Sequence, residues 1–323
     1  MSRPLAPRPR FGDQTPPAIF PPVLGALALG LAWRQSADIL AAPPAVGELI
    51  LGAVTLLYLF CVASYALKVV RRPGVLPEDL RVLPGRAGLS AMVLSAYLVS
   101  AALVPLAPGA ALGVLGAALA LHAGLVALVL AALIRGPAEQ RRVTPVWHLQ
   151  FVGFILAALP AQALGFAPLA SVLLHVTGAA ALAIWGASLV QFLREDVPAP
   201  LRPLLAIHLA PACLLGSVAL ALDNPGLGWA ATLFAGLLGA GLLIRLPWLI
   251  KAGFSPLWGA FTFPLAALAN LLLGLAPGQG TAIGIAGGIV LVAATLAIPP
   301  ILVAILRAWA RGGLGARTNA ARV

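Results

Sequence analysis

The sequence predicts an all-α integral membrane protein with ten transmembrane helices, paired as five helical hairpins. Hydrophobic residues make up 61% of the 323 residues, charged residues only 9%, and the mean hydropathy is +1.03. A soluble domain could not bury that much apolar surface. Apolar stretches of about twenty residues, long enough to cross the hydrocarbon core, recur along the chain. Nineteen of the twenty Lys and Arg residues lie on one side of this pattern.

The apolar stretches define the expected helices and the domain organisation. The ten expected spans are 17–34, 45–69, 86–106, 109–134, 145–165, 168–193, 203–222, 227–249, 256–275 and 281–307. They form one membrane domain over residues 17–308, flanked by an N-terminal tail over 1–16 and a basic C-terminal tail over 309–323. Because both tails are short and polar, we expect them to be poorly ordered.

The connections between the stretches alternate in charge. Those that follow the odd-numbered stretches are short or nearly uncharged, and those that follow the even-numbered stretches are basic; only Arg34 departs from this rule. Cytoplasmic loops of membrane proteins carry an excess of Lys and Arg, so the pattern predicts that both termini are cytoplasmic. The net charge of +11 is then an orientation signal, and no nucleic-acid partner is expected.

The first stretch also has the features of a secretory signal peptide. Three arginines precede the apolar run, and Ala41 and Ala42 follow it. Cleavage there would remove the first helix. We favour a retained helix, because residues 20–33 carry a family motif described below.

Helix breakers concentrate in the odd-numbered stretches. The seventh and ninth stretches each have a proline eight residues after their opening proline, at Pro211 and Pro264. The fifth stretch has Gly153 and Pro160. A proline inside a helix frees a carbonyl group, which a bilayer tolerates where a neighbouring helix or a water-filled cavity satisfies it. We therefore expect the odd-numbered helices to line a central path, although simple packing would explain the same residues.

The expected path has small and weakly polar walls. The candidate lining residues are Gly25, Gly30, Ser90, Ser95, Gly153, Ala210 and Ala267. Walls of this kind bind ions weakly and select by the cost of dehydration, and a bulky apolar side chain can act as a gate. Basic loops and helix N-termini at the cytoplasmic mouth would attract anions. The pattern favours passive passage of a small anion.

No residue pattern indicates an enzyme, a metal centre or a cofactor. The acidic residues lie in tails, connections or helix ends, and the four histidines lie on four different stretches without metal-ligand spacing. We expect these histidines to be hydrogen-bonded packing residues. His208 is the one histidine in an odd-numbered stretch placed before a proline kink, at Pro211, where it could titrate near neutrality.

Four motifs carry a resemblance to a known family. They are Phe20-Pro-Pro-Val-Leu-Gly25, Thr144-Pro-Val-Trp147 through Val152-Gly153, Arg202-Pro203 through Leu209-Ala-Pro211, and Trp258-Gly-Ala-Phe-Thr-Phe-Pro264. With them the chain resembles the bacterial TehA-type tellurite-resistance/dicarboxylate transporters, which are relatives of the plant slow-type anion channels. The last motif is the most specific, and the resemblance covers nearly all ten helices without the tails.

The resemblance implies five hairpins in a quasi-five-fold arrangement around a central pore lined by the odd-numbered helices. It also implies a homotrimer with one pore in each subunit, located in the bacterial inner membrane. A phenylalanine from the ninth helix is expected to plug the pore; we map it to Phe263, with Phe261 as the runner-up. Gln150 stands where many relatives have proline, which leaves open whether the fifth helix is kinked.

The sequence leaves alternative functions open. A proton-coupled exporter of tellurite, a dicarboxylate or a related anion would need a titrating group such as His208. A non-conducting membrane assembly or sensory subunit would have a closed centre. An intramembrane enzyme is least favoured, because polar residues do not cluster within the apolar stretches.

Overall fold

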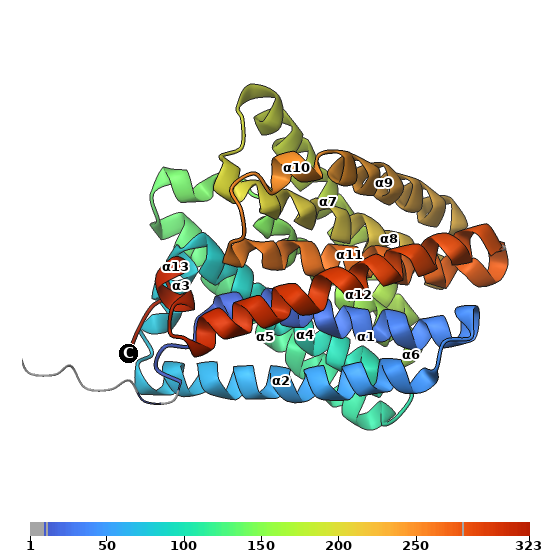
Figure 1. Ribbon diagram of the computed structural model, residues 1–323, viewed down its shortest axis with the longest axis horizontal. Helices are drawn as coiled ribbons and strands as arrows, with labels where there is room; N and C mark the ends of the chain where they lie inside the picture. Colours follow the sequence, from blue (N-terminus) through green and yellow to red (C-terminus); the bar gives the residue numbers. More distant parts are fainter. Residues whose placement is uncertain (1–9, 11, 280) are drawn as a thin grey trace, which may run out of the picture.

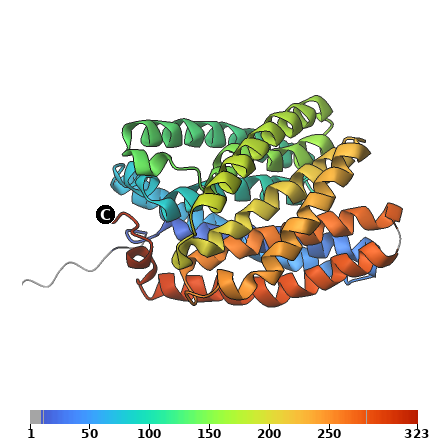
Figure 2. The same ribbon diagram turned by 90° about the horizontal axis from the view of Figure 1, so that it is seen from above.

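Helices account for all regular secondary structure in the computed structural model, which describes residues 10, 12–279 and 281–323. Nine helices in that part of the chain are long and apolar enough to cross a membrane, and His148–Ala163 forms a shorter apolar segment. The long helices lie side by side along the longest axis of the molecule (Figures 1 and 2).

The helices form two alternating sets that differ in burial. The buried set consists of α1 (Phe20–Leu40), α4 (Leu83–Leu103), α6 (Ile155–Ala163), α8 (Leu209–Ala221) and α11 (Gly259–Gln279). The exposed set consists of α2 (Pro44–Arg71), α5 (Pro108–Arg135), α7 (Ala167–Arg194), α9 (Pro225–Ile244) and α12 (Thr281–Ala310). In the spans that contain α1, α4, α8 and α11, 67–78% of the apolar window is buried, against 22–28% in the exposed set.

Contacts between the helices follow a regular order. Each buried helix packs against the exposed helix that follows it in the chain, which gives five consecutive hairpins. The buried helices also contact one another in the order α1, α4, α6, α8 and α11, and α11 packs against α1. Over the described residues these contacts form a closed cycle, which we call the inner cycle, and the exposed helices cover its outer side.

Four of the five buried helices begin with irregular turns. These turns are η1 (Pro17–Ile19), the π-helix η3 (His148–Val152), the ten-residue 3-10 helix η4 (Ala199–His208) and η5 (Pro256–Trp258). Proline lacks the N–H group that an α-helical hydrogen bond requires, so the prolines in η1, η4 and η5 favour non-α geometry. Runs of 3-10 helix longer than four residues are uncommon, which makes η4 an unusual element.

The fifth expected span is not one continuous helix. The π-helix η3 is followed by turn residues 153–154 and then by the nine-residue α6, which contains Pro160. The backbone is therefore irregular at this place even though Gln150 is not a proline. The first helix, in contrast, extends beyond residue 34 to Leu40. Short helices not expected from the sequence lie in two connections, α3 (Val75–Arg81) and η2 (Ala138–Arg141), and in the C-terminal tail, α13 (Leu314–Arg317). The eighth expected span, 227–249, is divided: its long helix ends at Ile244, and the short α10 (Leu246–Leu249) follows.

Close packing of α1 on α11 depends on Gly25. A Cβ atom at Gly25 would overlap both the side chain and the backbone of Thr262. The Thr262 hydroxyl donates to the Pro21 carbonyl at 3.1 Å, and Asn270 Nδ2 donates to the Ala28 carbonyl at 2.9 Å. Small residues allow membrane helices to approach closely and to bond across their interface in this way.

Replacement of Gly25 by leucine is therefore expected to destabilise the protein by about 1–3 kcal/mol, because overpacking forces neighbouring groups to move. A thermal unfolding curve in detergent measures the effect. Gly52→Leu on α2 is the matched control, since a Cβ there meets no atom within 4 Å. Equal melting temperatures for the two variants would contradict this view of the α1/α11 contact.

The C-terminal tail, expected to be poorly ordered, is packed against the rest of the chain. Leu314 and Thr318 are buried. The Ala321 N–H donates to Asp79 Oδ1 at 2.8 Å, and the Val323 N–H donates to the Asp13 carbonyl at 3.4 Å. Both described chain ends therefore lie together at one end of the bundle, near α3 and α13 (Figure 1).

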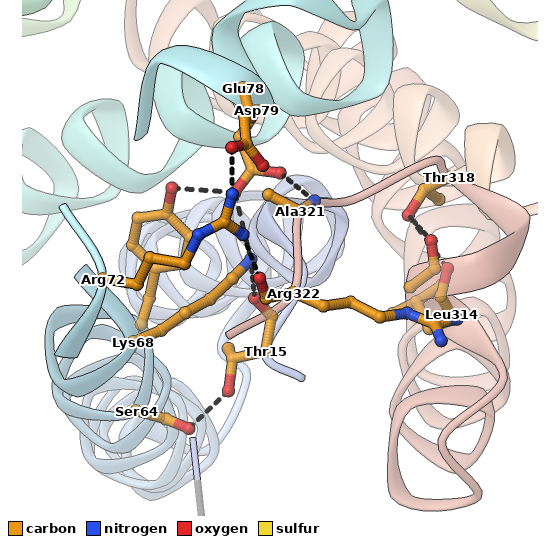
Figure 3. Close-up of polar contacts among 12 residues, drawn as sticks. Thr15, Ser64, Lys68, Arg72, Glu78, Asp79, Leu314, Thr318, Ala321 and Arg322 are labelled. Carbon is orange, nitrogen blue, oxygen red and sulfur yellow. Dashed lines mark hydrogen bonds and ion pairs between the residues drawn. The ribbon is translucent and has the colours of Figure 1, made fainter. Parts of the chain in front are cut away.

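A buried ion pair lies beneath these chain ends. Lys68 Nζ is 3.1 Å from Asp79 Oδ2, and both side chains are 0% exposed. Tyr65 Oη donates to the same carboxylate oxygen at 3.0 Å, and Lys68 also donates to the Thr15 carbonyl at 3.0 Å. With the Ala321 amide, these residues form what we call the terminal cluster (Figure 3). It joins α2, α3, the segment before η1 and the C-terminal tail.

Candidate functional site

A small cavity lies where the first turns of all five buried segments meet. Its lining includes Leu24, Ala91, Leu149, Ile207, Ala210 and Phe263. We call it the central cavity. Its volume is about 40 Å³, enough for only a few water molecules at about 10–15 Å³ each on this measure.

The wall of the central cavity is entirely apolar. Every lining residue is alanine, proline, leucine, isoleucine, glycine or phenylalanine. Ala87, Leu204, Ile207 and Ala260 on this wall belong to a small apolar cluster of their own. A wall of this type offers an ion no charged or hydrogen-bonding side chain, so it cannot hold an ion tightly.

Phe263 lies on the cavity wall and Phe261 does not. Phe263 is 6% exposed and is the fifth residue of α11. Ala260 and Pro264 lie beside it on the same wall. Ala260 is three residues before Phe263 and four before Pro264, and residues at these spacings share one face of a helix. Phe261 points elsewhere and packs edge-on against Trp258, with 5.8 Å between the ring centroids.

The glycines proposed for the path lie at contacts between helices. Gly25 faces Thr262 as described above, and a Cβ at Gly30 would meet Leu51 of α2 at 2.8 Å. A Cβ at Gly153 would meet Leu94 of α4 at 2.7 Å. These three positions let neighbouring helices approach one another.

The other candidates divide between the cavity and the helix interiors. Ala210 and Pro264 line the central cavity. Ala267, Pro160 and Pro211 are buried within α11, α6 and α8.

The two serines on α4 are buried and differ in their hydrogen bonding. Ser95 Oγ donates to the Ala91 carbonyl at 2.7 Å, within its own helix. The hydroxyl of Ser90 has no partner among the described residues.

The structure brings together two histidines that the sequence separates by sixty positions. His208 Nδ1 lies 2.9 Å from His148 Nε2, and the rings meet edge to face. The Trp185 indole N–H donates to the His208 carbonyl at 3.2 Å. His208 does not line the central cavity; it lies on the side of η4 that faces α7. Both histidines stand near the start of an odd-numbered span, but nothing in their spacing predicts the contact.

Two arginines, Arg86 and Arg202, lie near the cavity end of the bundle. Arg86 is buried and its Nη1 donates to the Leu80 carbonyl at 3.4 Å. Arg202 lies over the Trp248 ring, with 4.1 Å from its Cζ atom to the ring centroid, and pairs with Asp196 at 3.0 Å. Buried and partly buried charges are screened by salt less than exposed ones, which applies to the Arg86 guanidinium.

Ten apolar helical segments, a closed cycle of buried helices and an apolar cavity among their first turns define a polytopic integral membrane protein. A family model described as voltage-dependent anion channel matches residues 14–306, which include the central cavity and nearly all of the helical bundle. No curated protein matches the chain. The chain belongs to the voltage-dependent anion channel family. This family contains anion channels and transporters and not enzymes, and it includes the TehA-type proteins that the four motifs resemble.

Proposed function

We propose that this protein lets small anions cross the membrane passively through the middle of the inner cycle. The observation that carries the proposal is the central cavity, to which all five buried segments contribute and whose lining includes Phe263. In this view the five hairpins have quasi-five-fold symmetry around a pore, and the buried helices are its wall.

Passive movement fits the chemistry of the wall. An ion enters a path only if binding is favourable enough, and it leaves only if binding is weak. The apolar lining meets the second condition. The first condition is met outside the cavity, where the N-terminal ends of the buried helices carry partial positive charge. Selection among chloride, nitrate and larger anions would then follow the cost of dehydration.

The same end of the bundle is proposed to face the cytoplasm. The exposed helices run back toward the cavity end and finish there with basic residues, at Arg71, Arg135, Arg194 and Arg307. The positive-inside rule assigns such an end to the cytoplasm. A bacterial inner membrane and a homotrimer with one pore in each subunit remain proposals from the resemblance, and light scattering of the purified protein tests the trimer.

Proton-coupled export is the second candidate, because His208 and His148 form a partly buried pair beside the proposed pore. Passive passage predicts that His208→Gln retains wild-type flux, since an amide can keep one hydrogen bond but cannot carry a proton in the same way. Proteoliposomes that contain a pH-sensitive dye report chloride or nitrate flux and proton movement in the same experiment.

The outcomes separate the candidate functions. Anion flux without proton movement, in both wild type and His208→Gln, is the expected result. Proton movement that accompanies the anion and is lost in the variant would support coupled export. A folded and inserted protein that passes no anion would support a non-conducting assembly or sensory subunit.

A further inference from the structure

A second and much larger cavity opens on the outer side of the bundle. It lies between α7 and α9, with η4 as its floor, and its volume is about 680 Å³. We call it the lateral crevice. Its volume is in the usual range for cavities that hold small ligands, about 300–1,000 Å³. It lies outside the inner cycle and is not part of the proposed anion path.

The crevice has the depth of one membrane leaflet. The lining runs from Trp185 on α7 to Glu195, the residue that follows this helix, and from Phe234 on α9 to Arg245, the residue that follows that helix. Ten or eleven steps of about 1.5 Å along a helix span roughly 15–16.5 Å, about half of the 30 Å hydrocarbon core. The Trp185 and Phe234 rings close the deep end, with 4.8 Å between their centroids.

The lining changes from apolar at the deep end to charged at the rim. Leu189, Leu238 and Leu242 lie between the two ends. The rim has three arginines with different partners. Arg142 pairs with Glu195 at 2.6 Å, and Arg202, just beyond the lining, pairs with Asp196 at 3.0 Å.

The third arginine is Arg245, which is exposed and has no side-chain partner in the part of the chain that the structure describes. After the two ion pairs cancel, the rim keeps one positive charge. Two hydroxyl groups on the crevice wall, those of Ser188 and Thr144, are buried and also have no partner among the described residues. They can bond to oxygen atoms of a bound molecule.

We propose that the lateral crevice binds one anionic phospholipid of the leaflet at the basic end of the bundle. An acyl chain fits the apolar lower part, and the phosphate lies at the rim beside Arg245. The positive charge of Arg245 favours an anionic lipid over a neutral one, because a basic residue near the membrane surface attracts anionic headgroups.

The bound lipid would contact the wall of the central cavity. Leu204 of η4 lines both the crevice and the central cavity, and His208 of the same element lines the crevice. One long 3-10 helix therefore separates the lipid from the proposed pore.

Native mass spectrometry of the delipidated, full-length protein tests the site. The probes are phosphatidylglycerol and phosphatidylcholine with identical acyl chains, so that only the headgroup charge differs. We expect phosphatidylglycerol to bind about five-fold more tightly, the effect of one basic residue near a membrane surface. In Arg245→Gln the preference between the two lipids should disappear.

Two leucine variants on α9 test the crevice itself. A Cβ at either Gly241 or Gly236 meets no atom within 4 Å, but only Gly241 lines the crevice. Gly241→Leu should abolish saturable binding of both lipids, and Gly236→Leu should bind them as the wild type does. Both variants should keep the wild-type melting temperature.

Three outcomes would overturn the proposal. The first is equal binding of the two lipids by the wild type, and the second is unchanged lipid binding in Gly241→Leu. The third is a change in subunit number in Gly241→Leu, which would make the crevice an interface between copies of this chain. The assay reads lipid binding without flux, so its failure and a failure of anion transport are separate results.

Discussion

Replacement of Phe263 by alanine is expected to increase chloride flux by about ten-fold or more, which corresponds to a barrier lower by about 1.4 kcal/mol. Phe263 is 6% exposed and lines an apolar cavity with room for only a few waters. Narrow apolar constrictions block ions by excluding water, and removing the ring widens the constriction. Chloride efflux from proteoliposomes at equal protein density measures the change.

Phe261→Ala is the matched control for this experiment. Phe261 is on the same helix two residues away, but it packs against Trp258 and does not line the central cavity. We expect it to leave flux at the wild-type rate. A rise in flux in Phe261→Ala, with no rise in Phe263→Ala, would contradict the assignment of the gate to Phe263.

Replacement of Asp79 by alanine is expected to lower the free energy of unfolding by about 3–5 kcal/mol, because it leaves a buried charge without its partner. The carboxylate pairs with Lys68 at 3.1 Å, accepts from Tyr65 at 3.0 Å and accepts from the Ala321 amide at 2.8 Å. Its loss removes three contacts of the terminal cluster (Figure 3). Unfolding in mixed micelles of rising denaturing-detergent content measures the loss.

The neighbouring residue supplies the control. Glu78 pairs with Arg72, but these two side chains are 40% and 41% exposed. Exposed ion pairs contribute about 0–1 kcal/mol, so Glu78→Ala should have a small effect. Lys68→Met combined with Asp79→Leu should recover much of the stability, since apolar replacement of a whole buried pair is often neutral. If Asp79→Ala were as mild as Glu78→Ala, the terminal cluster would not stabilise the fold.

The hydropathy of the sequence was sufficient to locate the helices, because a transmembrane helix needs its own apolar stretch. Nine expected spans correspond to long helices, with ends that differ by a few residues. The largest of these differences is at the end of the first span, which was expected at Arg34 and lies at Leu40. The Arg34 guanidinium bonds to Glu48 at 2.6 and 2.8 Å and to the Ala102 carbonyl at 2.9 Å, so the charged residue is held within α1.

Contacts between distant residues could not be predicted from the sequence. Lys68 looked like an ordinary basic residue at a helix end, and its burial depends on Asp79, Thr15 and the C-terminal tail folding over it. Gly25 was expected on the path because it is small, but a single sequence does not show which helix faces it. The approach of Thr262 explains why a small residue stands there. Such pairings are set by the three-dimensional packing of the helices.

The central claim is that anions pass through the inner cycle and that Phe263 blocks them. Current across a planar bilayer containing Phe263→Ala, recorded under a potassium chloride gradient, tests it most directly. We expect a current whose reversal potential lies near the equilibrium potential of chloride. A reversal potential near that of potassium, or no current from protein shown to be folded and inserted, would contradict the account.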